Sequence, residues 1–329
     1  MFKVVPPIEI TDTGSPSQFV ASNVPENDET EWASGTTYST GDKVMVTDAG
    51  VHKRYESLKD SNTDNYPPDT TKDDLTDPWW LELSGTNRWA MFNTTVGDKT
   101  VSSETFSEAT YAVEPVDNTT AGIAVQITPQ QAVDYLAVFG VQGAYADVIV
   151  KDTDGNTTYS ERKSLTAELT EADFYAYFFE PFVDVGDAVS FRGLATVSEG
   201  DIFFSIQKTD TEDAQCGALA IGQQNDLGVA TYGTSIGITD FSRKERDTFG
   251  NFKIVERGFA KTMDAEVFIP FRRISAVQSK LAAVRAQPTV FEASDEVSAT
   301  LIFGFFTDFD ITISTPANAD ATITVEGLV

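Results

Sequence analysis

Short runs of alternating apolar and polar residues recur along this chain after residue 85, and no other feature constrains its fold as strongly. An alternation with a period of two is typical of strands that bury one face. Such runs occupy residues 121–128, 146–151, 188–192, 202–206, 252–256, 265–269, 289–292, 300–305 and 322–325. Because the runs are short and turn residues separate them, the pattern predicts antiparallel sandwiches or barrels instead of a parallel α/β sheet.

Two local patterns refine this mainly β prediction. Residues 152–156 hold Asp-Gly between two strand-like runs, which predicts the tip of a hairpin. Residues 273–285 contain the one helical pattern, with Ile274, Val277 and Leu281 at spacings of three and four. We expect this single helix to cover one face of a β unit. No repeat of about 20 to 50 residues is visible, so a solenoid or propeller is not predicted.

Changes in composition divide the chain into four parts. Its 329 residues leave room for two or three domains of about 100 to 150 residues each. We expect an extended arm (1–31), an aromatic module (32–83), a jelly-roll-like antiparallel sandwich (84–207) and a C-terminal β domain with the helix (208–329). The arm is rich in Pro, Ser, Thr, Asn and acidic residues, which is typical of a segment without its own core. It is either ordered by a neighbouring subunit or a loose terminus.

The net charge of −28, from 51 acidic and 23 basic residues, restricts the partners of this chain. Nucleic acids are not expected as ligands, because phosphate binding needs a cationic surface. Anionic membranes would repel the chain, and neither a run of 18 apolar residues nor a secretion signal is visible. The acidity is spread along the sequence and indicates solubility. Cys216 is the single cysteine, so no disulfide within the chain is expected.

The sequence marks out no catalytic centre. His52 is the only histidine, so Ser-His-Asp and Cys-His arrangements and a His/Cys zinc site are not expected. We expect His52 at the surface of a hairpin. Residues 152–163 begin like an EF-hand loop, but Thr157 and Lys163 replace the required Gly and Glu. A calcium site of another type stays open. We therefore predict a protein that is not an enzyme and has no cofactor.

The aromatic module has a distinctive order of residues. Trp32 is followed by Tyr38-Ser-Thr-Gly-Asp-Lys-Val44, then by Tyr55, by Tyr66-Pro-Pro and by Pro-Trp79-Trp80. This order resembles the chitin- and cellulose-binding modules of carbohydrate-binding type 5/12. Flat aromatic side chains in such modules bind the apolar faces of sugar rings.

The resemblance divides the aromatic residues of the module into two groups. It implies that Trp32, Tyr38, Val44 and one of the tryptophans Trp79 and Trp80 form the core. Tyr55, Tyr66 and the other tryptophan would face sugar, so the candidate binding residues are Trp79, Trp80, Tyr55 and Tyr66. The alternative is that all of these rings serve the core or dock onto another subunit.

Three further segments point to a biological context. Residues 86–92, 232–261 and 325–328 are similar to segments of virion structural proteins of tailed bacteriophages, found in tail-tip, fibre and adaptor components. The resemblance implies a tail component made in the host cytoplasm, which binds other tail proteins, copies of itself and host polysaccharide. A free carbohydrate-binding protein is the alternative, and a glycan depolymerase with two carboxylates is the third hypothesis. Within these segments, we expect Arg88 to fasten two domains and residues 242–247 to form a hydrated hairpin or a subunit contact.

Overall fold

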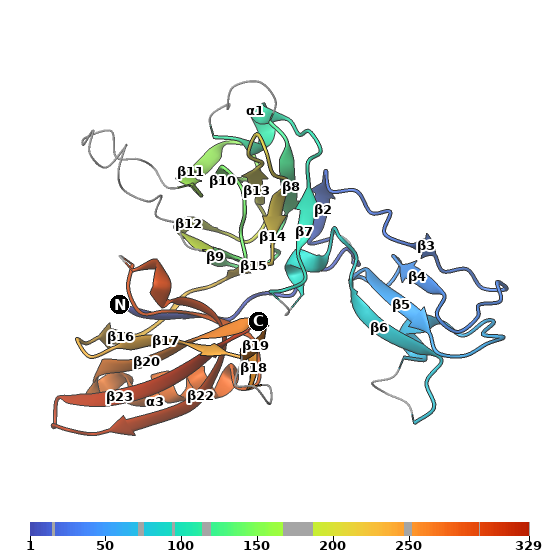
Figure 1. The fold of residues 1–329 in the computed structure, drawn as a ribbon. Helices are drawn as coiled ribbons and strands as arrows, with labels where there is room; N and C mark the ends of the chain where they lie inside the picture. Colours follow the sequence, from blue (N-terminus) through green and yellow to red (C-terminus); the bar gives the residue numbers. More distant parts are fainter. Residues whose placement is uncertain are drawn as a thin grey trace.

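The computed structural model describes residues 1–14, 17–71, 76–93, 96–113, 120–166, 187–246, 252–295 and 297–328. Half of the chain is strand and 9% is helix, so the mainly β class predicted from the alternation is confirmed. Figure 1 shows three units: the aromatic module stands to one side, and a sandwich lies against a barrel-like C-terminal unit.

The aromatic module is a four-stranded sheet in the order β3-β4-β5-β6. Its elements are β3 (Thr30–Glu31), β4 (Lys43–Val46), β5 (Lys53–Ser57), β6 (Trp80–Gly85) and the 3-10 helix η1 (Pro67–Asp69). β3 runs parallel to β4, and the other pairs are antiparallel. One face of the sheet holds a small cluster of mostly aromatic side chains, since this segment has few aliphatic residues to bury.

The middle unit is a sandwich of a five-stranded sheet, β11-β10-β13-β8-β2, and a three-stranded sheet, β12-β9-β15, beside the pair β14-β7. Its strands are β2 (Phe19–Ser22), β7 (Thr100–Ser102), β8 (Gly122–Ile127), β9 (Val133–Phe139), β10 (Tyr145–Lys151), β11 (Thr157–Ser164), β12 (Ala188–Val197), β13 (Asp201–Gln207), β14 (Ala214–Cys216) and β15 (Ala218–Gly222). Two short helices accompany them, η2 (Ala90–Phe92) and α1 (Glu108–Tyr111). The β10–β11 hairpin confirms the predicted turn. In this turn, the Asp152 carboxylate accepts hydrogen bonds from the backbone amides of Asp154 and Asn156.

The three-stranded sheet is buried on both faces. Leu136 and Val138 point into the sandwich core. Ala137 and Phe139, the residues that alternate with them, pack against the C-terminal unit, where Phe139 stacks on Phe303. Burial on both sides explains why these strands are almost continuously apolar. The sandwich and the C-terminal unit therefore share a core.

The C-terminal unit is a sheet whose pairing closes on itself, because β16 pairs with β20 as well as with β1 in the order β16-β1-β21-β22-β23-β20-β17. Its strands are β1 (Phe2–Val5), β16 (Asn225–Ala230), β17 (Ser235–Asp240), β20 (Phe259–Pro270), β21 (Thr289–Glu292), β22 (Leu301–Thr312) and β23 (Asn318–Gly327). The helices are η3 (Phe271–Arg273), α3 (Ile274–Ala283) and η4 (Ser298–Thr300). The predicted covering helix is confirmed as α3, which buries Val277 and Leu281 in the core of this unit.

The N-terminal arm gives one strand to each unit. β1 lies between β16 and β21 of the barrel, β2 pairs with β8 of the sandwich, and β3 pairs with β4 of the module. The described part of the arm therefore pairs with all three units of its own chain and is not a loose terminus. The long-range pairing adds backbone hydrogen bonds that the local sequence does not reveal.

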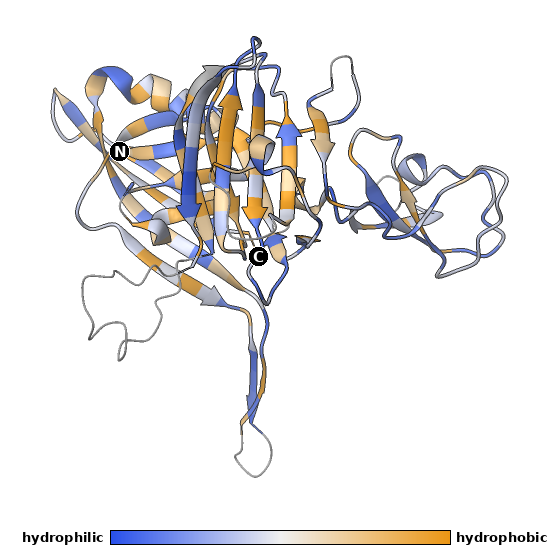
Figure 2. Ribbon diagram, turned by 90° about the horizontal axis from the view of Figure 1, so that it is seen from above, coloured by the Kyte–Doolittle hydropathy of each residue, from blue (hydrophilic) through white to orange (hydrophobic). Residues whose placement is uncertain are grey.

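Two further observations concern the region after residue 207. Residues 208–222, which the sequence places with the last domain, contain β14 and β15, and these strands pair with β7 and β9 of the sandwich. Between β17 and β20 the chain forms a two-stranded ribbon of β18 (Arg243–Arg246) and β19 (Phe252–Val255). Figure 2 shows this ribbon leaving the body of the molecule.

Candidate carbohydrate-binding surface

Trp80 is the tryptophan that forms the core of the module. It lies on β6 and is 0% exposed. Its Nε1 donates a hydrogen bond of 2.9 Å to the carbonyl of Asn65, and its ring meets the edge of Tyr38 at 5.2 Å. A buried indole whose N–H is satisfied contributes strongly to so small a core. Trp80 is therefore unavailable to a ligand.

Tyr55 also belongs to the core, so its predicted contact with sugar is wrong. It lies on β5 opposite Val44 and Glu82 and is 3% exposed. Burial raises the pKa of its hydroxyl, and the Glu82 carboxylate adds to this shift. β5 lies between β4 and β6, and Tyr55 belongs to the core cluster together with Tyr38, Val44 and Trp80. Two of the four candidate residues are thus structural.

Trp79 is half-buried and packs against the outside of the core cluster. The Lys59 ammonium lies 4.6 Å from the centre of its ring, a cation–π contact. The same ammonium is 2.7 Å from the Asp77 carboxylate. Lys59 therefore contacts the Trp79 ring, and Asp77 holds Lys59 in place. The ammonium and the carboxylate are both able to form hydrogen bonds with sugar hydroxyls.

Tyr66 is half-buried and lies beside Trp32. The ring centres are 5.2 Å apart in an edge-to-face arrangement. The Tyr66 hydroxyl donates a 2.5 Å hydrogen bond to Asp48, and burial together with this carboxylate raises its pKa. Trp32, which the resemblance implies to be a core residue, is itself half-buried and packs on the outside of the core. Trp32 is therefore a surface aromatic residue beside Tyr66, and the sequence did not indicate this position for Trp32.

Hydrogen bonds tie the segments of Tyr66 and Trp79 together. The Trp79 amide donates to the carbonyl of Thr70 at 3.0 Å, and the Thr70 hydroxyl donates to the carbonyl of Tyr66 at 2.7 Å. The two aromatic residues thus lie on neighbouring loops that share a hydrogen-bonded frame. Together with Trp32, they offer the apolar surfaces and carboxylates that non-catalytic sugar binding uses. We call Trp32, Asp48, Tyr66 and Trp79 the aromatic surface.

His52 has a structural place that the sequence does not indicate, and its expected surface position is wrong. It is 7% exposed. Its Nδ1 lies 2.6 Å from Glu26 and its Nε2 lies 2.6 Å from Asp12, both on the arm. Glu26 also accepts hydrogen bonds from Thr86 at 2.6 Å and from Arg88 at 3.1 Å.

These contacts shift two pKa values in opposite directions. Burial alone lowers the pKa of His52, but the hydrogen bonds and charges of Glu26 and Asp12 outweigh it and raise the pKa above 6.5. Burial alone raises the pKa of Glu26, but His52, Thr86 and Arg88 lower it below 4.5. His52 therefore links the arm to the module. We call Asp12, Glu26, His52, Thr86 and Arg88 the clamp.

Arg88, which lies between β6 of the module and η2, binds the arm from the other side. Its Nε donates to the carbonyl of Val24 at 2.9 Å, and its guanidinium pairs with Glu26. The neighbouring Trp89 is fully buried and packs against His52, with ring centres 4.8 Å apart and ring planes tilted by 44°. Arg88 thus fastens the arm to the segment that leaves the module, by hydrogen bonds and an ion pair.

A second ionic cluster lies between the sandwich and the barrel. Glu292 on β21 is 1% exposed. Its carboxylate pairs with Arg192 of β12 and with the ammonium of Lys3, which is 3.5 Å away. Lys3 also binds Asp295 at 2.8 Å. The cluster links the arm, the sandwich and the barrel.

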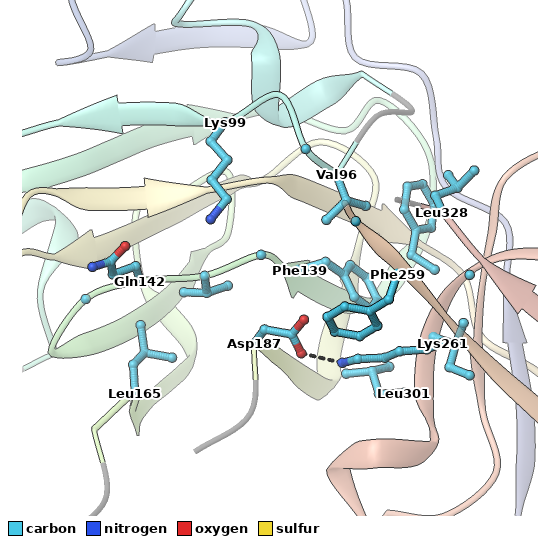
Figure 3. Close-up of a pocket in the computed structure, with 18 of the residues that line it drawn as sticks. Val96, Lys99, Phe139, Gln142, Leu165, Asp187, Phe259, Lys261, Leu301 and Leu328 are labelled. Carbon is cyan, nitrogen blue, oxygen red and sulfur yellow. Dashed lines mark hydrogen bonds and ion pairs between the residues drawn. The ribbon is translucent and has the colours of Figure 1, made fainter. Parts of the chain in front are cut away.

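A cavity of about 1100 Å³ lies between the same two units (Figure 3). Phe139 lines it from the sandwich, and Phe259 and Leu301 line it from the barrel. Lys261 and Asp187 form an ion pair at its wall. Lys99 and Glu212 also line the cavity, so its wall is a mixture of apolar and charged side chains. It lies apart from the aromatic surface, since no residue of the module lines it.

The described residues contain no group of three or more His, Cys, Asp or Glu side chains that could hold a metal ion. Among the same residues, no helix is long and apolar enough to cross a membrane. No model of a known protein family matches the chain, and no curated protein matches its sequence significantly.

Proposed function

We propose that this protein is a structural component of a bacteriophage tail, located at the tip or the fibre attachment region. In this role it assembles with other tail proteins and with copies of itself, while the aromatic module contacts host-surface glycans. The observation that carries the proposal is the placement of the module. It stands beside the sandwich and barrel (Figure 1), and its residues Tyr66 and Trp79 are only half-buried.

The path of the arm supports a structural role. Its strands β1, β2 and β3 each pair with a different unit. Pulling two units apart would therefore break backbone hydrogen bonds as well as side-chain contacts. The clamp at His52 links the arm to the module, and the cluster at Glu292 links the arm, the sandwich and the barrel. Such cross-linking suits a protein that transmits force between a virion and a cell surface.

Localisation in the virion tests the tail assignment. Fab fragments raised against the purified protein would be added to intact virions of the phage that encodes it and imaged by cryo-electron microscopy. We expect Fab density at the tail tip or where fibres attach. Fab density confined to the capsid, or a virion proteome that lacks the chain, would refute the assignment.

A free carbohydrate-binding protein is the second candidate, favoured by the aromatic surface itself. Here the module binds host polysaccharide without any virion. Sedimentation with insoluble chitin, cellulose and host polysaccharide measures the binding, and Trp79→Ala and Tyr66→Ala should each weaken it. Tyr232→Ala is the matched control, since Tyr232 is fully exposed on the barrel, far from the module in sequence. Absence of binding by the wild-type chain removes glycan recognition from both candidates.

A further inference from the structure

The β18–β19 ribbon is exposed along both of its strands. All eight of its residues are exposed, and β18 and β19 pair only with each other. A two-stranded ribbon with no third strand and no covering layer is only marginally stable in water. A partner that covers one face would stabilise this ribbon.

One face of the ribbon is both apolar and cationic. Lys244 is opposite Ile254 and Arg246 is opposite Phe252, and paired residues two positions apart share a face. Phe252 is 61% exposed and Ile254 is 63% exposed. The Arg246 guanidinium lies 4.4 Å from the centre of the Phe252 ring. We call these four side chains the ribbon face.

The charge around the ribbon opposes that of the rest of the chain. Residues 240–261 hold six basic and four acidic residues, although the whole protein carries a net charge of −28. One of the four, Asp240, pairs with Lys244 at 2.7 Å and compensates part of its charge. The ribbon is therefore a positively charged projection on an acidic protein. Two ribbons facing each other would repel, whereas a ribbon and an acidic surface attract.

The outer face of the barrel provides such a surface. On β20, β23 and β22, the pairing aligns Asp264, Thr324 and Asp308 in one row, and Glu266, Thr322 and Asp310 in the next. All four carboxylate residues are exposed, and no ion pair involves them within the described residues. No basic residue follows Arg285 in the sequence. We call these four carboxylates the acidic face.

Aromatic residues border the acidic face. The next row on one side contains Phe305, paired with Glu326, and the next row on the other side contains Phe268, paired with Asp320. Both phenylalanines are half-buried. The acidic face is therefore complementary to the ribbon face in two respects, because it offers carboxylates to the cations and apolar borders to Phe252 and Ile254.

We propose that the ribbon face of one protomer docks onto the acidic face of a second copy of this chain. The ribbon leaves the body of its own protomer (Figure 2), so it is free to reach a neighbour. Different surfaces meet in this contact, which makes it head-to-tail. Such contacts build a ring when the rotation closes and a filament when it does not. The inference names the surface for the self-assembly part of the proposed function and makes no use of location in a virion.

Charge exchange tests the contact on the full chain. Sedimentation velocity over a range of protein concentrations would be measured for the wild type, for Lys244→Glu/Arg246→Glu and for Asp308→Lys/Asp310→Lys. We expect the wild type to self-associate, and each double variant to do so at least about tenfold more weakly. An equimolar mixture of the two variants should associate again, since an intact ribbon then meets an intact acidic face. The same melting temperature for all three proteins would show that the exposed substitutions leave the fold unchanged.

Two further variants separate the ribbon from general effects of charge and from electrostatics alone. Lys280→Glu/Arg285→Glu makes the same change in net charge at exposed positions outside both faces, and it should associate like the wild type. Phe252→Ser/Ile254→Ser keeps the charge and should associate more weakly. The proposal is overturned by a wild-type chain that stays monomeric, by charge-reversed variants that associate as the wild type does, by a mixture that stays monomeric, or by an equal loss in the control. Localisation of the chain in virions is unaffected by any of these results.

Discussion

Replacing Glu26 by glutamine should destabilise the protein far more than a typical change at a carboxylate. The Glu26 side chain is 8% exposed and accepts hydrogen bonds from His52, Thr86 and Arg88. Charge-assisted hydrogen bonds contribute about 1.5 to 3 kcal/mol each. Glutamine keeps an acceptor oxygen but loses the charge and turns an N–H₂ group toward a donor. We expect a loss of about 2 to 4 kcal/mol in the free energy of unfolding.

The contribution of the clamp to the free energy of unfolding depends on pH in a defined direction. The pKa of His52 is raised in the folded protein, so its contribution is fully present below pH 6.5 and is lost as the pH rises through the raised value. The pKa of Glu26 is lowered, so its contribution is present above pH 4.5 and is lost as the pH falls through the lowered value. The clamp should therefore stabilise the fold most between about pH 4.5 and pH 6.5.

Urea denaturation followed by tryptophan fluorescence measures both effects, because Trp89 packs against His52 and reports on the clamp. The wild type, Glu26→Gln and His52→Gln would be compared from pH 4 to pH 8. Glu82→Gln is the matched control, since Glu82 pairs with Lys53 while its side chain is 32% exposed, and it should cost less than about 1 kcal/mol. Equal losses for Glu26→Gln and the control, or a difference between the wild type and His52→Gln that does not change with pH, would refute the reasoning.

Three other substitutions test separate parts of the structure. Trp80→Ala should destabilise the module by about 3 to 5 kcal/mol, whereas Trp79→Ala should leave its thermal melting nearly unchanged, as circular dichroism would show. Glu292→Gln removes the buried negative charge that pairs with Arg192 and should speed hydrogen exchange of β12 and β21, measured by mass spectrometry; unchanged exchange would contradict the role of this cluster. Gly304→Ala should lower the melting temperature, because a Cβ there would collide with the backbone of Glu326. An unchanged melting temperature would show that the strands can separate locally.

Local patterns predicted the elements well where one face of an element is buried. The alternation over residues 265–269 and 322–325 corresponds to β20 and β23, along which buried and more exposed residues alternate, and the spacing of Val277 and Leu281 corresponds to α3. In each case the period of the apolar residues equals the period of the backbone, so the sequence carries the information locally. The aromatic order of residues 32–83 likewise indicated a compact unit with an aromatic core.

The candidate site was predictable only in part. The sequence placed Tyr66 and Trp79 in the candidate surface, but it could not separate them from Tyr55 and Trp80, because all four are aromatic residues in one small unit. Tyr55 and Trp80 lie on strands β5 and β6 and belong to the core cluster, whereas Tyr66 and Trp79 lie outside these strands and pack against that cluster. Trp32, which follows β3, packs against the same cluster.

The sequence alone determined that this chain is mainly β, acidic, and provided with one helix and one aromatic module. The tertiary structure decided the contacts between distant residues. His52 meets Asp12 and Glu26 across 40 and 26 positions, and β1 closes a barrel whose other strands begin more than 200 residues later. Polar and short segments of this kind carry no periodic signal, since their partners lie elsewhere in the chain. Only the folded backbone brings those partners together and gives the arm its order.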